Sequence, residues 1–268
     1  MKELSLQELK KIELETLKMF RDFCNENGIS YFLSNGTLLG AVKYKGFIPW
    51  DDDIDVFVPR DDYDRMLTLF KDNDRYKLFA FEKNEKYPYP FAKLCDMRTY
   101  KEQTIYKNKD VKLGVEMDIF PLDAWNNDYE EAKLEGKKIR SYIKLLKLTK
   151  LEAPLTKNPI KYVVWSAIIV LLKFLGSKYF IKQIIRITRN RPDSEHHYLG
   201  CKSWCIYGER EIVPANVFED SVEVEFEGEI FNAPVGFDTY LRMLYGDYEK
   251  DPPIDKQKTH HAFVAYWL

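Results

Sequence analysis

Apolar residues at helical spacing open the chain and predict its first element. Ser5 and Glu8 fit a capping box, in which the serine hydroxyl and the glutamate carboxylate each accept a backbone N–H at a helix start. Gly28 is the residue type that ends helices in a left-handed conformation. We therefore expect a helix between these points, with an apolar face made of Leu9, Ile12, Met19, Phe20 and Phe23.

Short apolar runs then alternate with helical patterns up to about residue 125. Runs rich in β-branched and aromatic residues and bounded by turn residues are typical of strands. Helical spacing predicts helices at about 37–42 and 60–73. Strands with intervening helices predict an α/β (α+β) fold, with a mixed sheet and flanking helices. The expected strands are 29–34, 54–59, 76–83, 91–98 and 114–122.

The middle of the chain changes in character. Residues 128–150 form a basic helical pattern, and residues 162–176 form the most apolar run of the chain. That run contains Lys173 and is shorter than the ~20 residues that span a bilayer. We expect a buried helix of a helical subdomain here. The alternative is a helix that lies in a membrane interface beside the basic helix.

The last part of the chain returns to strands. Residues 222–234 predict strands, residues 237–248 predict a helix, and the remainder is expected to be a polar loop that ends in "KTHHAFVAYW".

Composition and charge exclude several classes of protein. Of 268 residues, 45% are apolar, which is usual for a globular protein. Lys and Arg number 41 against 43 Asp and Glu, so the basic excess of a nucleic-acid-binding protein is missing. The N-terminus lacks the pattern of a signal peptide, and four cysteines are few for a secreted scaffold. We therefore expect the protein to reside in the reducing cytoplasm. Cys201 and Cys205 follow His196 and His197 at no common zinc spacing, and we expect ordinary half-buried cysteines.

The stretch "PWDDDIDVFVP" (residues 49–59) carries the clearest candidate chemistry. Strand alternation points Asp53 and Asp55 to one face, while Ile54 and Val56 point to the other. Carboxylates two residues apart on a strand can bind the same Mg²⁺ or Mn²⁺ ion, and the cation removes their mutual repulsion. The alternative for a D-x-D pattern is a solvated charged turn.

The surroundings of the aspartates favour the metal site. Backbone amides at Gly36 and Thr37, in a glycine turn that leads into a helix, could hold a phosphate. Asp118 is a third acid within an apolar strand, and Glu116 on the same face is the fallback third ligand. Acids and a glycine turn placed in this way are typical of metal-assisted phosphoryl transfer.

These motifs resemble the LicD family, the bacterial phosphocholine transferases related to fukutin and fukutin-related protein, in the nucleotidyltransferase-fold superfamily. The resemblance rests on the block "FLSNGTLLGAVKYKGFIPWDDDIDVFVPRDDYDRM" and on three further blocks. These are "KLCDMRTY", "VEMDIFPLD" and "YGDYEKDPPIDKQKTHH".

The resemblance implies a division of the chain. Residues 1–125 would be a nucleotidyltransferase-like catalytic core, and residues 126–200 a mainly helical insertion that faces a membrane or the acceptor. Residues 201–268 would complete the core and the active site.

The resemblance also implies roles for single residues. Asp53 and Asp55 would hold Mg²⁺ or Mn²⁺, and Asp118 would complete the site or act as general base. Asp51 and Asp52 stay unassigned. The expected donor-binding residues are Gly36, Thr37, Trp50, Lys93, Arg98, Lys256, Lys258, His260 and His261. Aromatic faces hold a quaternary ammonium by cation–π attraction, and the candidates are Trp50, Tyr44, Tyr87 and Tyr89.

The implied reaction moves phosphocholine from CDP-choline to a hydroxyl of a teichoic acid, capsular or lipopolysaccharide precursor and releases CMP. Such precursors are lipid-linked, so we expect a cytoplasmic protein with a peripheral contact to the inner face of the membrane. The alternatives are CDP-glycerol or CDP-ribitol as donor, nucleotide transfer from an NTP, and a non-catalytic glycan- or lipid-binding protein.

Overall fold

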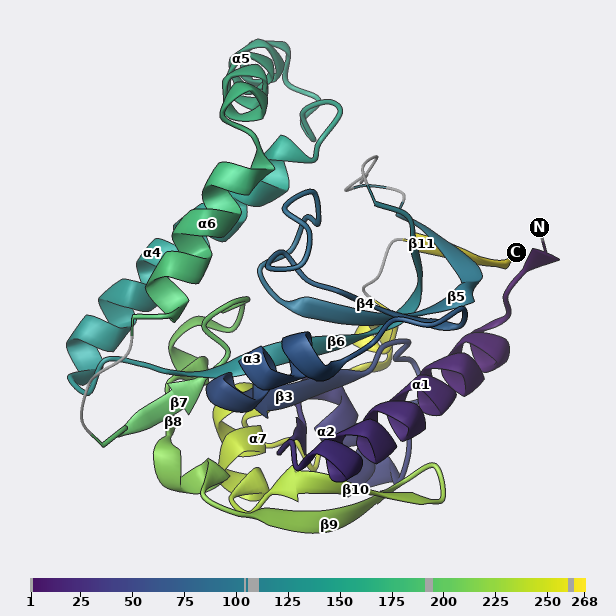
Figure 1. Cartoon of the computed structure of the whole chain (residues 1–268). Helices are drawn as coiled ribbons and strands as arrows, with labels where there is room; N and C mark the ends of the chain where they lie inside the picture. The colour runs from purple at the N-terminus through teal and green to yellow at the C-terminus, as the bar shows by residue number, and fades with distance from the viewer. Residues whose placement is uncertain (1, 104, 106–110, 191–194, 260–262) are drawn as a thin grey trace.

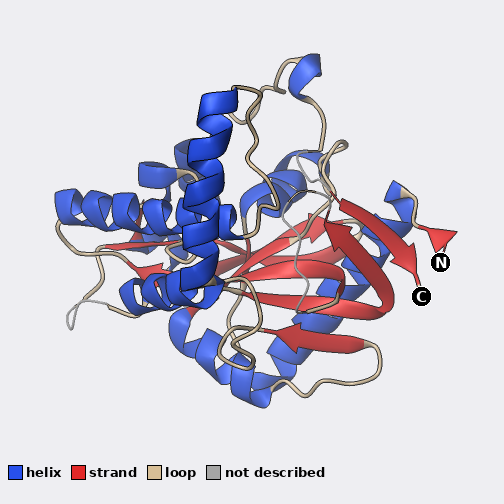
Figure 2. Ribbon diagram, turned by 90° about the horizontal axis from the view of Figure 1, so that it is seen from above, coloured by secondary structure: helices blue, strands red, loops and turns tan. Residues whose placement is uncertain are grey.

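The computed structural model describes residues 2–103, 105, 111–190, 195–259 and 263–268. A mixed sheet of nine strands forms its centre in these residues, and helices pack around it (Figures 1 and 2). The predicted α/β (α+β) class is therefore confirmed.

The main path of the sheet runs in the order β1-β11-β5-β6-β3-β2, with β4 also paired to β5 and with β7 and β8 continuing from β6. Among the described strands, β3 and β6 form a parallel pair and the other pairs of this sheet are antiparallel. The strands are β1 (Lys2–Glu3), β2 (Phe32–Leu33), β3 (Asp55–Pro59), β4 (Tyr76–Phe79), β5 (Ala92–Gln103), β6 (Leu113–Ala124), β7 (Tyr198–Gly200), β8 (Val213–Pro214) and β11 (Phe263–Trp267).

The five strands predicted before residue 125 are all present, as β2 to β6. A separate antiparallel hairpin is formed by β9 (Ser221–Phe226) and β10 (Glu229–Pro234), as predicted for residues 222–234. Glu227 and Gly228 join its strands with φ values of 53° and 76°. Positive φ at both turn residues matches the right-handed twist of a tight hairpin.

The first helix begins and ends where the sequence predicts. Ser5 and Glu8 form the complete capping box at the start of α1 (Leu6–Asn27), and Gly28 ends it with φ 58°. The other helices of the sheet region are α2 (Asn35–Tyr44), α3 (Arg60–Leu69) and α7 (Phe237–Tyr245). Short 3-10 turns lie at Gly208–Glu211, Ala215–Phe218 and Ile254–Lys256.

Three helices form an arm at one end of the sheet: α4 (Tyr129–Thr149), α5 (Pro159–Leu175) and α6 (Ser177–Thr188). Figure 1 shows α4 and α6 side by side, with α5 beyond them at the end farthest from the sheet. Their inner residues, such as Ile139 and Phe180, belong to the same apolar core as the strands. The predicted division at 125 and 200 stays a prediction.

The expectation that residues 162–176 are buried is wrong. In α5, Ile169 and Leu172 are buried, whereas Phe174 is 88% exposed and Ile160 is 76% exposed. The apolar run forms a helix, but the rest of the protein covers little of it. Among the described helices none alone has the length and apolar character of a membrane span, although the pair α5 and α6, bent by 70°, meets those criteria together.

The end of the chain also differs from the prediction. Residues 263–267 form β11 rather than a loop, and β11 lies between β1 and β5 in the sheet. The strand is short and follows a polar segment, so its pattern alone does not reveal it. Its stability comes from pairing on both edges and from burial of Ala265.

Candidate active site

A cavity of about 1000 Å³ opens where α2, the start of β3 and the segment after α7 meet. Eight acidic and four lysine side chains are among its lining residues, so its field is negative and suits cations. Asp53, Asp55 and Asp118 all line it, together with Gly36 and Trp50. The structure thus brings the three predicted catalytic acids to one cavity.

The parallel pairing of β3 and β6 places Asp55 directly beside Asp118. Asp55 is 9% exposed, and burial raises the pKa of its carboxyl well above its usual range, with the charges of Asp53 and Asp118 adding to the effect. Burial likewise raises the pKa of Asp118. Two carboxyls held together in this way are costly to ionise unless a positive charge joins them.

Lys93 supplies one such charge from β5. Its ammonium donates to the carboxylate of Asp118 and, at 3.1 Å, to Glu116. Burial alone would lower the pKa of Lys93, but the charges of Asp118 and Glu116 outweigh it and hold the pKa well above its usual value. Lys101 donates to Glu116 at 2.9 Å. Lys93 does not line the cavity, so it contacts the site through Asp118.

Glu116, the fallback third ligand, is therefore committed to two lysines. Burial would raise the pKa of Glu116, but Lys101 and Lys93 lower it below its ordinary value. Glu116 is 3% exposed and is not among the residues that line the cavity.

The residues of the glycine turn lie in close contact with the aspartates of the site. The hydroxyl of Thr37 accepts the backbone N–H of Asp55 at 2.8 Å, and Thr37 does not line the cavity. A Cβ at Gly36 would lie 2.6 Å from Oδ2 of Asp51, so only glycine permits this approach of the carboxylate. Thr37 is thus placed to position Asp55, and a donor phosphate at Gly36 would meet Asp51.

The C-terminal block contacts the aspartate cluster and contributes to the cavity lining. The hydroxyl of Thr259 donates to Oδ1 of the buried Asp52 at 2.7 Å. Lys256 and Lys258 line the cavity, as expected for donor-binding residues. His260 and His261 lie outside the described residues.

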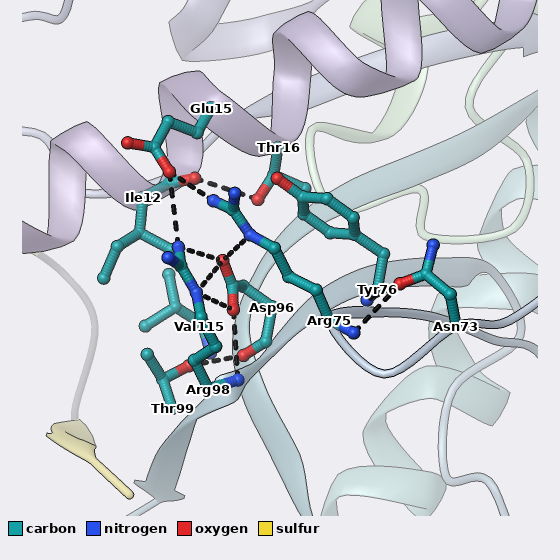
Figure 3. A network of polar contacts seen from close by, with 10 residues as sticks. All are labelled: Ile12, Glu15, Thr16, Asn73, Arg75, Tyr76, Asp96, Arg98, Thr99 and Val115. Atoms are coloured by element: carbon teal, nitrogen blue, oxygen red, sulfur yellow. Dashed lines mark hydrogen bonds and ion pairs between the residues drawn. The ribbon is translucent and has the colours of Figure 1, made fainter.

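Arg98 is not among the residues that line the cavity. Its guanidinium binds the buried Asp96 at 2.7 Å and Glu15 of α1 at 3.2 Å. Arg75 joins the same two acids, so the network ties α1 to β5 (Figure 3). The geometry gives Arg98 a structural position and no contact with the site.

Aromatic rings are a large part of the cavity lining. Trp50 and Tyr44 lie at one side with ring centroids 6.2 Å apart, as predicted. Tyr87 and Tyr89, the other predicted rings, are buried outside the lining. The sequence reasoning missed the other rings of the lining, which are Phe120, Trp204, Tyr207, Tyr245 and Tyr248.

Glu211 is an acid of the lining that the sequence reasoning also missed. It is 4% exposed, and burial raises its pKa to about 8. The backbone N–H of Tyr207 donates to its carboxylate at 2.7 Å. The aspartates could be found because they sit in a strand pattern, whereas Glu211 lies in a short 3-10 turn without one.

Within the described part of the chain, no three His, Cys, Asp or Glu side chains are gathered closely enough to form a ready metal site. The metal assignment of Asp53, Asp55 and Asp118 thus stays a prediction. Cys201 and Cys205 are buried free thiols rather than half-buried ones, and burial raises the pKa of both.

Several known proteins are similar in sequence to this chain. Residues 28–149 match the family described as LicD/FKTN/FKRP, nucleotidyltransferase domain. The chain is 33% identical over 273 aligned residues to the lipopolysaccharide cholinephosphotransferase LicD of Haemophilus influenzae, and the alignment covers 100% of both chains. It is 29% identical over 122 residues to an uncharacterized protein of Rickettsia typhi, covering 44% of this chain and 37% of that one. The matched region contains the glycine turn, β3 and β6, and the chain belongs to the LicD family.

Proposed function

We propose that the chain is a phosphotransferase that moves phosphocholine from CDP-choline to a hydroxyl of a cell-surface glycan precursor and releases CMP. The observation that carries the proposal is the adjacent pair of the buried Asp55 and the half-buried Asp118, which line an acidic, aromatic-lined cavity. The full-length similarity to a cholinephosphotransferase supports the same reaction class.

The donor set fits a divalent cation. Asp53, Asp55 and Asp118 offer hard oxygen atoms to one cavity, and the raised pKa values of Asp55 and Asp118 mark an excess of buried negative charge. These residues would hold Mg²⁺ or Mn²⁺, which when bound would neutralise the phosphate oxygens of the donor. Thr37 and Lys93 would keep the carboxylates of Asp55 and Asp118 in place.

Cavity lysines provide partners for the donor diphosphate. Lys43, Lys250, Lys256 and Lys258 line the cavity beside the acids. Lys43 donates to Asp251 and to the carbonyl of Tyr248, which holds its ammonium at the rim. An ammonium is a compact charge suited to phosphate oxygens.

The reaction forms one bond and breaks one. The acceptor hydroxyl oxygen attacks the phosphorus that carries choline, its proton leaves to a base, and the bond from that phosphorus to the CMP oxygen breaks. Asp118 is the candidate base, since burial raises its pKa above the ordinary value of a carboxyl and so makes it a stronger base. Its second candidate role is that of the third metal ligand.

The aromatic lining of the cavity favours a donor that carries a cationic alcohol over a donor that carries a neutral one. A quaternary ammonium against a ring gains ~0.5–2 kcal/mol, depending on its desolvation. Glycerol and ribitol carry no charge and gain no such term. Tyr207 and Tyr245, with ring centroids 5.8 Å apart, line the same cavity as Glu211, and a cation bound beside Glu211 would favour the ionised form of this carboxyl, whose pKa burial raises to about 8.

The test is a donor panel. The purified chain is incubated with CDP-choline, CDP-glycerol, CDP-ribitol and an NTP, each with and without Mg²⁺ and a glycan acceptor, and CMP release is measured. We expect metal-dependent CMP release from CDP-choline. Release from another donor would assign that alcohol instead, transfer from the NTP would indicate a nucleotidyltransferase, and binding without release would indicate a non-catalytic protein.

Two variants sharpen the result. Asp53→Ala is expected to abolish turnover and keep the fold, because it removes charge repulsion rather than packing. Asp74→Ala is the matched control, since Asp74 is exposed and lies outside the cavity lining. Equal activity of the two variants would refute the role of Asp53.

The acceptor and the location are part of the same proposal. A lipid-linked glycan precursor at the inner face of the cytoplasmic membrane would bring the acceptor hydroxyl to a cytoplasmic enzyme. Lipopolysaccharide is the acceptor in the name of the Haemophilus relative, and teichoic acid and capsule precursors are the other candidates.

A further inference from the structure

Helix α5 presents an apolar surface that the rest of the protein leaves uncovered. Large apolar residues along the whole helix are exposed, and the most exposed, Phe174, has 88% of its surface free. Folded proteins seldom expose so many neighbouring apolar side chains without a partner. The α5 surface consists of Ile160, Val163, Val164, Trp165, Val170, Leu171, Phe174 and Leu175.

The charge around this surface is strongly positive. Residues 137–189 contain 13 of the 41 Lys and Arg residues of the chain, but only one of its 43 Asp and Glu residues. Lys157, Lys161 and Lys173 are exposed on α5 or just before it, whereas Lys178 at the start of α6 pairs with Glu85. The chain as a whole has a net charge of −2, so the arm is basic and the remainder is acidic.

The position of α5 leaves it free to meet a large flat partner. Figure 1 shows it at the end of the arm, beyond α4 and α6. The apolar residues Phe180, Ile181 and Ile184 of α6 are buried in the protein core, so α6 is anchored and α5 is available.

We propose that the α5 surface docks on an anionic lipid bilayer, with α5 lying in the headgroup interface. Apolar side chains would enter the acyl boundary while the lysines contact anionic headgroups. Lys161 and Lys173 can bury their aliphatic stems and keep their ammonium groups at the surface. Trp165, Tyr162 and Tyr179 have the amphipathic rings that are enriched at this depth.

A second copy of the chain is a less suitable partner. A two-fold contact through α5 would place two basic arms against each other, and like charges oppose such a contact. The bilayer supplies the opposite charge and an apolar interior together.

The test is vesicle flotation of the full chain. We expect the protein to float with vesicles of phosphatidylcholine and phosphatidylglycerol, to float poorly with phosphatidylcholine alone, and to be released as salt rises. The double substitution Leu171→Glu and Phe174→Glu is expected to lower the partition coefficient at least about tenfold. Both residues are exposed, at 63% and 88%, so the fold is expected to survive.

Matched variants make the result specific. Ile230→Glu is the control, since Ile230 is 47% exposed and lies on β10, outside the arm. This variant is expected to float as the unmodified chain does. The double substitution Lys161→Glu and Lys173→Glu should also abolish flotation, which provides a second readout if the first variant misfolds. CMP release with a water-soluble acceptor should be unchanged in both, so a failed donor assay and a failed docking assay remain distinguishable.

Either of two kinds of result, in flotation or in self-association, would overturn the proposal. One is absence of flotation at low salt, or flotation that the α5 substitutions leave unchanged. The other is self-association in sedimentation velocity that Leu171→Glu and Phe174→Glu abolish, which would assign the surface to a second copy.

Discussion

Lys93→Met is the most informative substitution in the buried charge network. It keeps the length and apolar stem of the side chain but removes the ammonium that joins Asp118 and Glu116. The side chain of Lys93 is 8% exposed, so water cannot replace the lost charge. Glu116 retains Lys101 at 2.9 Å, whereas Asp118 loses the ammonium that contacts it.

The magnitude follows from these contacts. Removing one partner of a buried ion pair costs about 3–5 kcal/mol. Lys101 still neutralises Glu116, and Asp118 can bind a proton, so we expect a loss of about 2–4 kcal/mol in the free energy of unfolding. For a chain of this size that lowers Tm by roughly 5–15 °C.

The loss should depend on pH. Without Lys93 the pKa of Asp118 rises further above its unfolded value. A carboxyl with a raised folded pKa stabilises the fold at low pH, and this contribution is lost as pH rises through the folded pKa. The stability gap between Lys93→Met and the unmodified chain is therefore larger at about pH 8 than at about pH 5.

Thermal unfolding followed by circular dichroism at both pH values, with and without Mg²⁺, measures this. Lys77→Met on β4 is the control, because Lys77 is exposed on a neighbouring strand. If Lys93→Met matched the control, or if its deficit were the same at both pH values, the proposed charge balance around Asp118 would be refuted.

Further predictions concern the other parts of the site. Thr37→Val leaves the buried N–H of Asp55 without its acceptor and should cost about 1–3 kcal/mol in denaturant unfolding, whereas Thr37→Ser should retain most of the stability. Glu211→Gln should lose less stability than the unmodified chain as pH rises from about 4.5 to about 8, because glutamine stays neutral whereas the folded pKa of Glu211 is raised to about 8; unfolding curves across that range that coincide with those of the unmodified chain would contradict this. Arg98→Gln should lower Tm by a few degrees at most, since Arg75 still pairs with Asp96, and should leave CMP release unchanged; a large loss of turnover would place Arg98 in donor binding after all.

The local parts of the site follow well from the sequence. Strand alternation predicts that Asp53 and Asp55 face the same cavity, and the apolar setting of Asp118 predicts its place in the sheet. The prediction for Asp118 holds because neighbours along a strand have fixed directions. Asp53 lies in the loop just before β3, so its place beside Asp55 follows from its closeness along the chain rather than from strand alternation. Both outcomes depend on few distant contacts. The capping box of α1 is confirmed for the same reason.

Features that depend on distant contacts do not follow from the sequence. Arg98 looks like any cation near a motif, and only the folding of α1 onto β5 brings Glu15 to it. The composition of α5 does not predict its exposure, because an apolar sequence is expected both for a helix covered by protein and for a helix covered by another medium. Trp204 and Glu211 reach the cavity from a segment with no recognisable signature.

The place of β11 has a consequence for how the chain acquires its structure during synthesis. Residues 99–103 of β5 pair with residues 263–267 of β11. About 160 further residues must therefore leave the ribosome before this edge of β5 can pair with β11. During that time the edge is an open template for pairing with other chains. β1, at residues 2–3, pairs with β11 and must also wait. Nascent chains stalled before residue 263 should therefore be more prone to aggregate than the finished protein, and refolding should have a slow step that ends with the arrival of β11.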